Sequence, residues 1–317
     1  MTLRKEDEMR KIIFMGTPDF ALSILTCLTQ LDCEIVAVIT QSDKAVGRKQ
    51  VIKFSPVKVF ALDHHLPVLQ ALKIKDIKDE IANLQSDLII TCAYGQFIPE
   101  SILNLPKFGC VNIHASLLPK YRGGAPIHKA IIDGQTETGI TLMKMIKQMD
   151  AGDIIAQSAI PIDPDDTLGT LHDKLMIVAS DLLKVKFDLL FQDNVPALKQ
   201  DEALVTYAYN IQAEEEYISF QRDAYIVYNH IRGLSPWPIG YGVIDAKKLK
   251  IIQASLLIEA HDYPLGTLIG LQQNALKVAA LGGFILIIEC QSEGKGKMKA
   301  NEFFNGMGKT LLNHRFD

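Results

Sequence analysis

The sequence has no long apolar run and no spacing that pairs its cysteines. No stretch approaches the roughly 18 uninterrupted apolar residues that a membrane span needs, and residues 1–11 are charged where a signal peptide would be apolar. The five cysteines are odd in number and form no CxxC pair, which argues against a disulfide framework and a zinc site. These absences predict a cytoplasmic protein with reduced cysteines, no metal and no membrane contact.

The sequence also lacks the glycine pattern of dinucleotide-binding proteins. The turn after the first apolar run reads Gly-Thr-Pro-Asp at residues 16–19 and has no GxGxxG spacing. That spacing allows a backbone to approach a pyrophosphate closely. A nicotinamide oxidoreductase is therefore disfavoured.

The first half of the chain alternates apolar strand-like runs with helix-like segments. Such alternation indicates right-handed strand–helix–strand crossovers and a mostly parallel sheet. A long helix-like stretch at residues 167–191 ends this part. We therefore predict an α/β domain with a Rossmann-like, mostly parallel sheet. The segments that carry this prediction are residues 11–15, 20–31, 35–40, 56–64, 86–93 and 109–113.

The chain beyond residue 206 has short apolar runs separated by Gly, Asp and Asn. This texture predicts a small OB-like β-barrel, a fold that commonly binds nucleic acid or oligosaccharide. The charge of this domain gives little support to binding of a polyanion, because residues 207–317 hold eleven Lys and Arg against eleven Asp and Glu. The predicted parts are an N-terminal extension at residues 1–8, the α/β domain at 9–193, a linker at 194–206 and the barrel domain at 207–317.

Three polar side chains are predicted at neighbouring strand ends of the α/β domain. Residues 108–113 have the pattern of a short buried strand, and Asn112 and His114 share one face because alternate side chains point the same way. Asp150 follows the strand-like run 139–146 in a turn that contains glycine. The carboxyl ends of the strands form the ligand-binding edge of an open α/β sheet. An amide, a base and a carboxylate gathered there suit proton transfer at a reacting carbonyl carbon.

These motifs resemble those of the methionyl-tRNA formyltransferases along nearly the whole chain. The resemblance rests on IIFMGTPDFA at residues 12–21, AYG at 93–95, IP at 98–99, the run 112–127 and MDAGD at 149–153. It implies the formyltransferase fold and the catalytic set Asn112, His114 and Asp150. It also implies transfer of the formyl group of 10-formyltetrahydrofolate to the amino group of initiator methionyl-tRNA, for translation initiation.

The chemistry of formyl transfer suggests a role for each member of this set. Asn112 would donate a hydrogen bond to the formyl oxygen under attack, and His114 would donate or relay a proton. Asp150 would orient His114 or hold a water. The folate would lie against two loops that follow strand ends, and no metal is needed. The predicted cofactor-binding residues are Tyr94, Phe97, Ile98, Ser116, Leu117, Leu118 and Pro119.

A polar loop of the first domain predicts a contact with nucleic acid. Residues 41–54 carry four basic side chains against one acidic residue, Asp43, and the loop is long for its place between a strand and a helix. The resembled family inserts a basic loop here against the acceptor stem of tRNA. No obligate protein partner is expected. The predicted tRNA-binding residues are Lys44, Arg48, Lys49, Lys53 and Arg122.

Other functions remain open at this point. A sugar N-formyltransferase would use the same folate chemistry on an amino sugar and would need no basic loop. The chain could also be a non-catalytic protein that binds tRNA or folate, although all three catalytic side chains are present. The glycinamide ribonucleotide transformylases rank lower because they lack the second domain.

Overall fold

The computed structural model describes residues 9–46 and 51–317. The predicted extension at residues 1–8 and the predicted tRNA-binding residues Arg48 and Lys49 lie outside the described residues. Within the described ranges, no helix is long and apolar enough to cross a membrane.

The chain forms two compact units, and each one combines separate stretches of sequence. Unit 1 contains the described residues up to Gly124 together with Gly139–Ile160 and Asp173–Ala208. Unit 2 contains Ala125–Thr138, Pro161–His172 and Tyr209–Asp317. The predicted domain limits stay a prediction. They assign residues 125–138 and 161–172 to the α/β domain, whereas these two segments cluster with unit 2.

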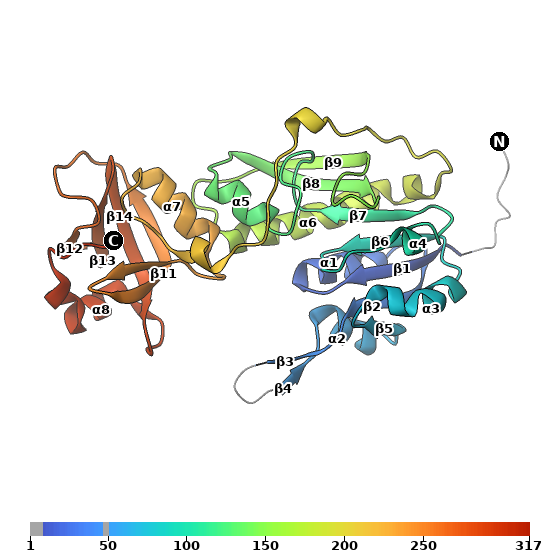
Figure 1. Cartoon of the computed structure of the whole chain (residues 1–317), viewed down its shortest axis with the longest axis horizontal. Helices are drawn as coiled ribbons and strands as arrows, with labels where there is room; N and C mark the ends of the chain where they lie inside the picture. Colours follow the sequence, from blue (N-terminus) through green and yellow to red (C-terminus); the bar gives the residue numbers. More distant parts are fainter. Residues whose placement is uncertain (1–8, 47–50) are drawn as a thin grey trace. The chain divides into compact units, whose positions relative to one another are not determined.

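The first sheet has seven strands in the order β5-β2-β1-β6-β7-β8-β9 (Figure 1). The five strands from β5 to β7 pair in parallel, and β8 pairs with β7 in the antiparallel direction. This confirms the predicted Rossmann-like, mostly parallel sheet. The strands are β1 (Lys11–Gly16), β2 (Glu34–Gln41), β5 (Val68–Ala71), β6 (Leu88–Cys92), β7 (Cys110–His114), β8 (Glu137–Lys144) and β9 (Ile154–Pro161).

The central strands are buried on both faces, which explains their unbroken apolar sequences. The side chains of β1 from Ile12 to Met15 have no exposed surface, and every residue of β6 is buried. Parallel strands covered by helices show continuous apolar runs rather than alternation. The helices and their bounds are α1 (Asp19–Leu28), α2 (Pro56–Asp63), α3 (Lys78–Asn83), α4 (Glu100–Leu103), α5 (Pro126–Ile132) and α6 (Leu168–Lys186).

A polar residue and a proline mark the start of helix α2. Ser55 caps α2 by accepting a hydrogen bond from the Lys58 amide, and Pro56 occupies the first turn, where no amide donor is needed. The predicted long helix is α6, which continues into a 3-10 turn at Phe187–Phe191.

The second sheet lies in unit 2, and its strands pair in the antiparallel direction. Its strand order is β10-β11-β14-β13-β12, with β15 paired to β14. Helix α7 (Ala224–Gly233) and helix α8 (Ala300–Gly306) contribute Ile231 and Phe303 to the core of this unit. The prediction of a smaller β domain after the α/β domain is confirmed. The strands are β10 (Tyr241–Ile244), β11 (Lys247–Leu257), β12 (Leu268–Gln272), β13 (Ala275–Ala280), β14 (Gly283–Ser292) and β15 (Met298–Lys299).

Candidate active site

Strand β7 places the predicted amide and base at the carboxyl edge of the parallel strands. His114 is the last residue of β7, and Asn112 pairs with Thr91 of the neighbouring strand β6. His114 is almost fully buried, with 6% of its surface exposed, and Asn112 is half-buried. Both side chains therefore lie at the rim of the sheet, where the chain leaves β6 and β7.

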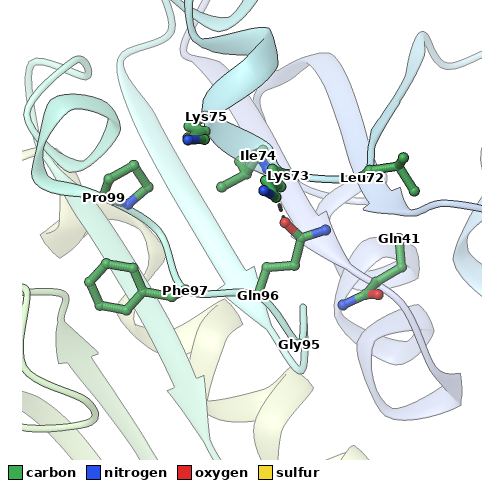
Figure 2. A pocket seen from close by; sticks show the side chains of 9 residues that line it. All are labelled: Gln41, Leu72, Lys73, Ile74, Lys75, Gly95, Gln96, Phe97 and Pro99. Carbon is green, nitrogen blue, oxygen red and sulfur yellow. Dashed lines mark hydrogen bonds between the residues drawn. The ribbon is translucent and has the colours of Figure 1, made fainter.

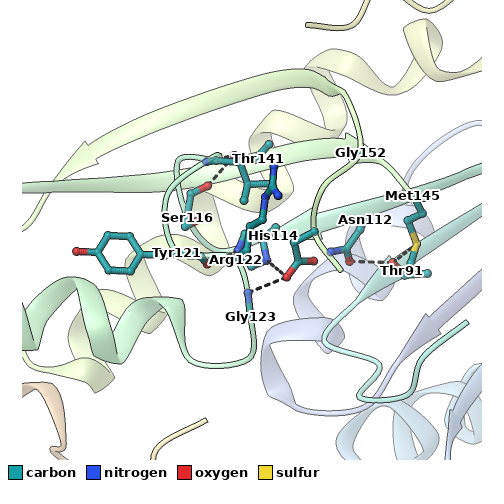
Figure 3. Close-up of polar contacts among 12 residues, drawn as sticks. Thr91, Asn112, His114, Ser116, Tyr121, Arg122, Gly123, Thr141, Met145 and Gly152 are labelled. Atoms are coloured by element: carbon teal, nitrogen blue, oxygen red, sulfur yellow. Dashed lines mark hydrogen bonds and ion pairs between the residues drawn. The ribbon is translucent and has the colours of Figure 1, made fainter. Parts of the chain in front are cut away.

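Each nitrogen of the His114 ring has a polar neighbour. Its Nε2 lies 2.9 Å from the carbonyl oxygen of Tyr121, and a carbonyl oxygen can only accept, so Nε2 carries a hydrogen. Its Nδ1 lies 3.7 Å from Oδ2 of Asp150 (Figure 3). A proton arriving at Nδ1 would therefore face a carboxylate.

Asp150 is fixed by the loop that follows β7. Its Oδ2 accepts a hydrogen bond of 2.8 Å from the amide of Gly123. Its backbone has a φ of 49°, in the left-handed region that Asp tolerates better than most residues. One carboxylate thus joins the Gly123 turn to the His114 ring.

Asn112 is oriented by the preceding strand. The hydroxyl of Thr91 donates to Oδ1 of Asn112 at 2.8 Å, and Figure 3 shows the amide nitrogen turned away from Thr91. The two branches of the amide therefore have separate tasks: the oxygen is anchored and the nitrogen can donate. The structure brings Asn112, His114 and Asp150 to one edge of unit 1, and their catalytic roles remain a proposal.

If Asn112 is the predicted oxyanion donor, Asn112→Ala is expected to lower kcat by about 100- to 1,000-fold, because the charge that this donor would stabilise forms only in the transition state. Steady-state kinetics of formyl transfer measures this effect. Asn104→Ala, at an exposed asparagine just after α4, is the matched control. Equal kcat values for the two variants would contradict the assignment.

Arg122 does not fit the predicted contact with tRNA. Its side chain has no exposed surface. Its Nε and Nη2 donate to Oε1 of Gln200 at 3.0 and 2.8 Å, and its Nη1 and Nη2 donate to the Glu202 carboxylate at 3.3 and 2.9 Å. A guanidinium that is buried and engaged in this way cannot reach a phosphate. We correct its role to an internal one.

The predicted cofactor loops differ in exposure. Tyr94, Ile98, Ser116 and Leu118 are buried, and Phe97 is 63% exposed. Leu117 and Pro119 are half-buried. The loop of residues 116–119 is bound internally. The Ser116 carbonyl accepts from the Thr141 hydroxyl, the Leu118 amide donates to that hydroxyl, and the Leu118 carbonyl accepts from Gln157. These hydrogen bonds use backbone groups and fix the course of the loop, and the predicted contacts of its side chains with a folate stay predictions.

Two neighbouring cavities border the loop after β6. The first has a volume of about 430 Å³ and includes Phe97 on its wall (Figure 2). The second has a volume of about 450 Å³ and includes Tyr94, Lys44 and Lys53. Gln41 and Gly95 line both cavities. Part of the predicted cofactor loop therefore faces open space, and the binding roles of these residues stay predictions.

The predicted basic loop forms a short two-stranded ribbon. Strand β3 (Lys44–Val46) pairs with β4 (Val51–Lys53), which puts Lys44 opposite Lys53. Lys58 donates to Asp43 at 2.6 Å, and this hydrogen bond lowers the pKa of the Asp43 carboxyl. The acidic residue of the loop is thus already paired within unit 1. Two cations remain side by side on the described part of the ribbon.

Among the described residues, no group of three or more His, Cys, Asp or Glu side chains is placed to hold a metal ion. The sequence reasoning missed Gln200, whose side chain contacts the Asp150 loop. Gln200 lies 50 residues from Asp150, within the segment predicted as a linker, and no local pattern in the sequence connects the two positions.

Comparison with known proteins agrees with this architecture. The formyl transferase family model matches residues 9–184, and the model of the formyl transferase C-terminal domain matches residues 210–308. A methionyl-tRNA formyltransferase from Staphylococcus epidermidis is 46% identical over 307 residues, which cover 96% of this chain and 98% of the relative. One from Lysinibacillus sphaericus is 45% identical over 306 residues, with the same coverage.

A solved structure gives the same fold. The crystal structure of WlaRD, a sugar 3N-formyl transferase, in the presence of dTDP and 5-N-formyl-THF matches with a TM-score of 0.67. It is 25% identical and the match covers 92% of this chain and all of that one. The two family models and the relatives at 45–46% identity span both units. The chain therefore belongs to the methionyl-tRNA formyltransferase family.

Proposed function

We propose that this protein transfers a formyl group from 10-formyltetrahydrofolate to the amino group of initiator methionyl-tRNA in the cytoplasm. The observation that carries the proposal is the convergence of Asn112, His114 and Asp150 at one sheet edge. That edge lies in a chain whose relatives named for methionyl-tRNA formylation match along both units. A formylated folate as donor is supported by the formyl transferase family and by WlaRD, which was crystallised in the presence of 5-N-formyl-THF.

The nucleophile in this reaction needs little activation. An α-amine has a reference pKa of roughly 7.7 to 8.0, so a useful fraction is neutral near pH 7. Its attack on the formyl carbon forms a C–N bond and moves an electron pair to the formyl oxygen. The Asn112 amide is the donor that stabilises this oxyanion.

Proton movement completes the exchange. The attacking amine loses a proton, and N10 of the folate gains one as its bond to the formyl carbon breaks. Because Nε2 of His114 already donates to Tyr121, Nδ1 is the ring atom that can take up and return a proton. Asp150, 3.7 Å away, stabilises the ring while it carries the charge. This assignment uses each of the three side chains once.

The acceptor is tested by competition. With labelled formyl donor, wild-type protein is given initiator methionyl-tRNA and a dTDP-linked amino sugar in the same reaction. The proposal expects the label in the tRNA fraction. Label in the sugar fraction would instead support a sugar N-formyltransferase, the activity named for WlaRD, whose fold matches that of this chain.

The ribbon lysines provide a separate prediction about tRNA. Changing Lys44 and Lys53 to Ala is expected to raise KM for tRNA and leave kcat nearly unchanged. The slope of log(kcat/KM) against log[salt] should become shallower by about 1.8, because each lost phosphate contact removes about 0.9. Lys11 and Lys184 are exposed cations of unit 1 outside the ribbon, and their Ala variant is the control. An unchanged salt slope in the ribbon variant would overturn the contact.

A further inference from the structure

Gln200 holds the loop that carries Asp150. Its Nε2 donates to the carbonyl oxygen of Asp150 at 2.8 Å and to that of Gly152 at 2.7 Å. Gln200 is 4% exposed, so both hydrogen bonds lie away from solvent. One side-chain amide therefore uses its two donors on the backbone at both sides of residue 151.

Arg122 fixes the direction of this amide. Two guanidinium nitrogens donate to Oε1 of Gln200, at 3.0 and 2.8 Å. A guanidinium has only donors, so the atom it faces must be the amide oxygen, and the Gln200 nitrogen must then face the loop. The planar fork of Arg gives this contact an orientation that a lysine cannot reproduce. We refer to Arg122 and Gln200 as the clamp.

Arg122 of the clamp lies next in sequence to the residues whose backbone contacts His114 and Asp150. Arg122 is flanked in sequence by Tyr121, whose carbonyl holds His114, and by Gly123, whose amide holds Asp150. The backbone here is bound to the segment that follows Gln200. Arg122 donates its amide to the Thr206 carbonyl at 2.9 Å and accepts from the Ala208 amide at 2.8 Å. The segment predicted as a linker thus supports the site within unit 1.

We propose that Arg122 and Gln200 are positioning residues that hold the Asp150 carboxylate against His114 during formyl transfer. This inference rests on the proposed function. The clamp binds backbone carbonyls rather than the carboxylate, so Oδ2 of Asp150 stays directed at Gly123 and the imidazole. Reaction rates depend steeply on such placement, since an error of about 1 Å can cost about 100-fold in rate.

Gln200→Glu tests the clamp with little change in shape. The new carboxylate still accepts from Arg122, but it turns an acceptor toward two carbonyl oxygens where Gln200 had a donor. We expect kcat to fall by roughly 10- to 100-fold, with KM for the folate and for tRNA within about twofold. Gln192→Glu, the same change at an exposed amide of unit 1, is the matched control and should keep wild-type kcat. A kcat of Gln200→Glu within twofold of wild type would overturn the proposal.

A double-mutant cycle separates positioning from general support of the fold. If Gln200 acts through Asp150, then adding Gln200→Glu to Asp150→Asn should lower kcat by less than about twofold further, because the group being positioned is already lost. Losses that multiply fully would contradict the proposal. Arg122→Lys keeps the charge without the fork and serves as the second variant if Gln200→Glu does not fold, with the same cycle and the same expected outcome.

Amide hydrogen exchange tests the clamp without any substrate. Exchange in residues 148–153 should be faster in Gln200→Glu than in Gln192→Glu and in wild type. If the wild-type protein fails to formylate methionyl-tRNA, the proposed function fails, and with it the part of the clamp in formyl transfer. Faster exchange in Gln200→Glu would in that case still show that the clamp stabilises the Asp150 loop. Unchanged exchange would overturn the clamp itself.

Discussion

His114→Ala is expected to lower kcat by about 100- to 10,000-fold, the range for loss of a general acid–base group. The variant keeps the sheet intact, because the β7 backbone pairs with β6 and β8 independently of the side chain. It removes the ring whose Nδ1 faces Asp150. Substrate affinity should change much less than kcat, since the role proposed for the ring is to carry a proton during the reaction.

His64→Ala is the control for this variant. His64 is an exposed histidine at the end of α2, and its ring contacts the carbonyl of Phe60 within its own helix. Its loss should leave kcat close to the wild-type value. Single-turnover rates of formyl transfer measure both variants. A His114→Ala rate within tenfold of wild type would show that His114 does not transfer the proton.

Gly152→Ala is expected to disable the site through the backbone. A Cβ at residue 152 would lie 1.7 Å from the carbonyl oxygen of Lys144 and 2.7 Å from its carbonyl carbon. Neither atom belongs to a flexible side chain, so the loop itself must move. The Lys144 amide also donates to the Asp153 carbonyl at 2.9 Å, which ties the loop to β8 on this side.

A shift of the loop would displace Asp150 and disturb the hydrogen bonds of the clamp. Gly152 supplies one of the two carbonyls that Gln200 holds, and Asp150 supplies the other. We expect a loss of stability of about 1–3 kcal/mol, as for other overpacked sites, and a fall in kcat of about 100-fold from the displaced carboxylate. Thermal unfolding and steady-state kinetics measure the two effects.

Gly296→Ala provides the comparison, because a Cβ there meets no atom within 4 Å. This variant should behave as the wild type in both measurements. Wild-type stability and kcat in Gly152→Ala would mean that the loop tolerates the movement and that the position of Asp150 is not critical.

The sequence predicts the sheet well because its central strands are buried on both faces. Continuous apolar runs such as those of β1 and β6 are typical of strands that helices cover on both faces. On β7, alternate side chains point the same way, which puts Asn112 and His114 on the same side of the strand. The crossover rule fixes the hand of the connections, whereas the spatial order of the strands is known only from the structure. The catalytic candidates could therefore be identified before any geometry was known.

The supporting residues could not be found in this way. Arg122 follows a turn and precedes two glycines, a context typical of a surface cation, and its burial depends on Gln200 and Glu202 from a distant segment. Gln200 has no motif of its own. The polar loop after β2 pairs into a ribbon with Ala45 opposite Ile52, which its charged composition obscured. The positions of Arg122 and Gln200 depend on contacts between residues far apart in sequence. The ribbon forms in a segment whose charged composition predicts a loop.

The most direct test of the proposed reaction is the fate of the formyl group in a single turnover. Wild-type protein, labelled 10-formyltetrahydrofolate and initiator methionyl-tRNA are mixed, and the aminoacyl ester is then hydrolysed. Formyl transfer to the tRNA predicts labelled formylmethionine and tetrahydrofolate in equal amounts. Label that stays on the folate, or that reaches only an added amino sugar, would contradict it.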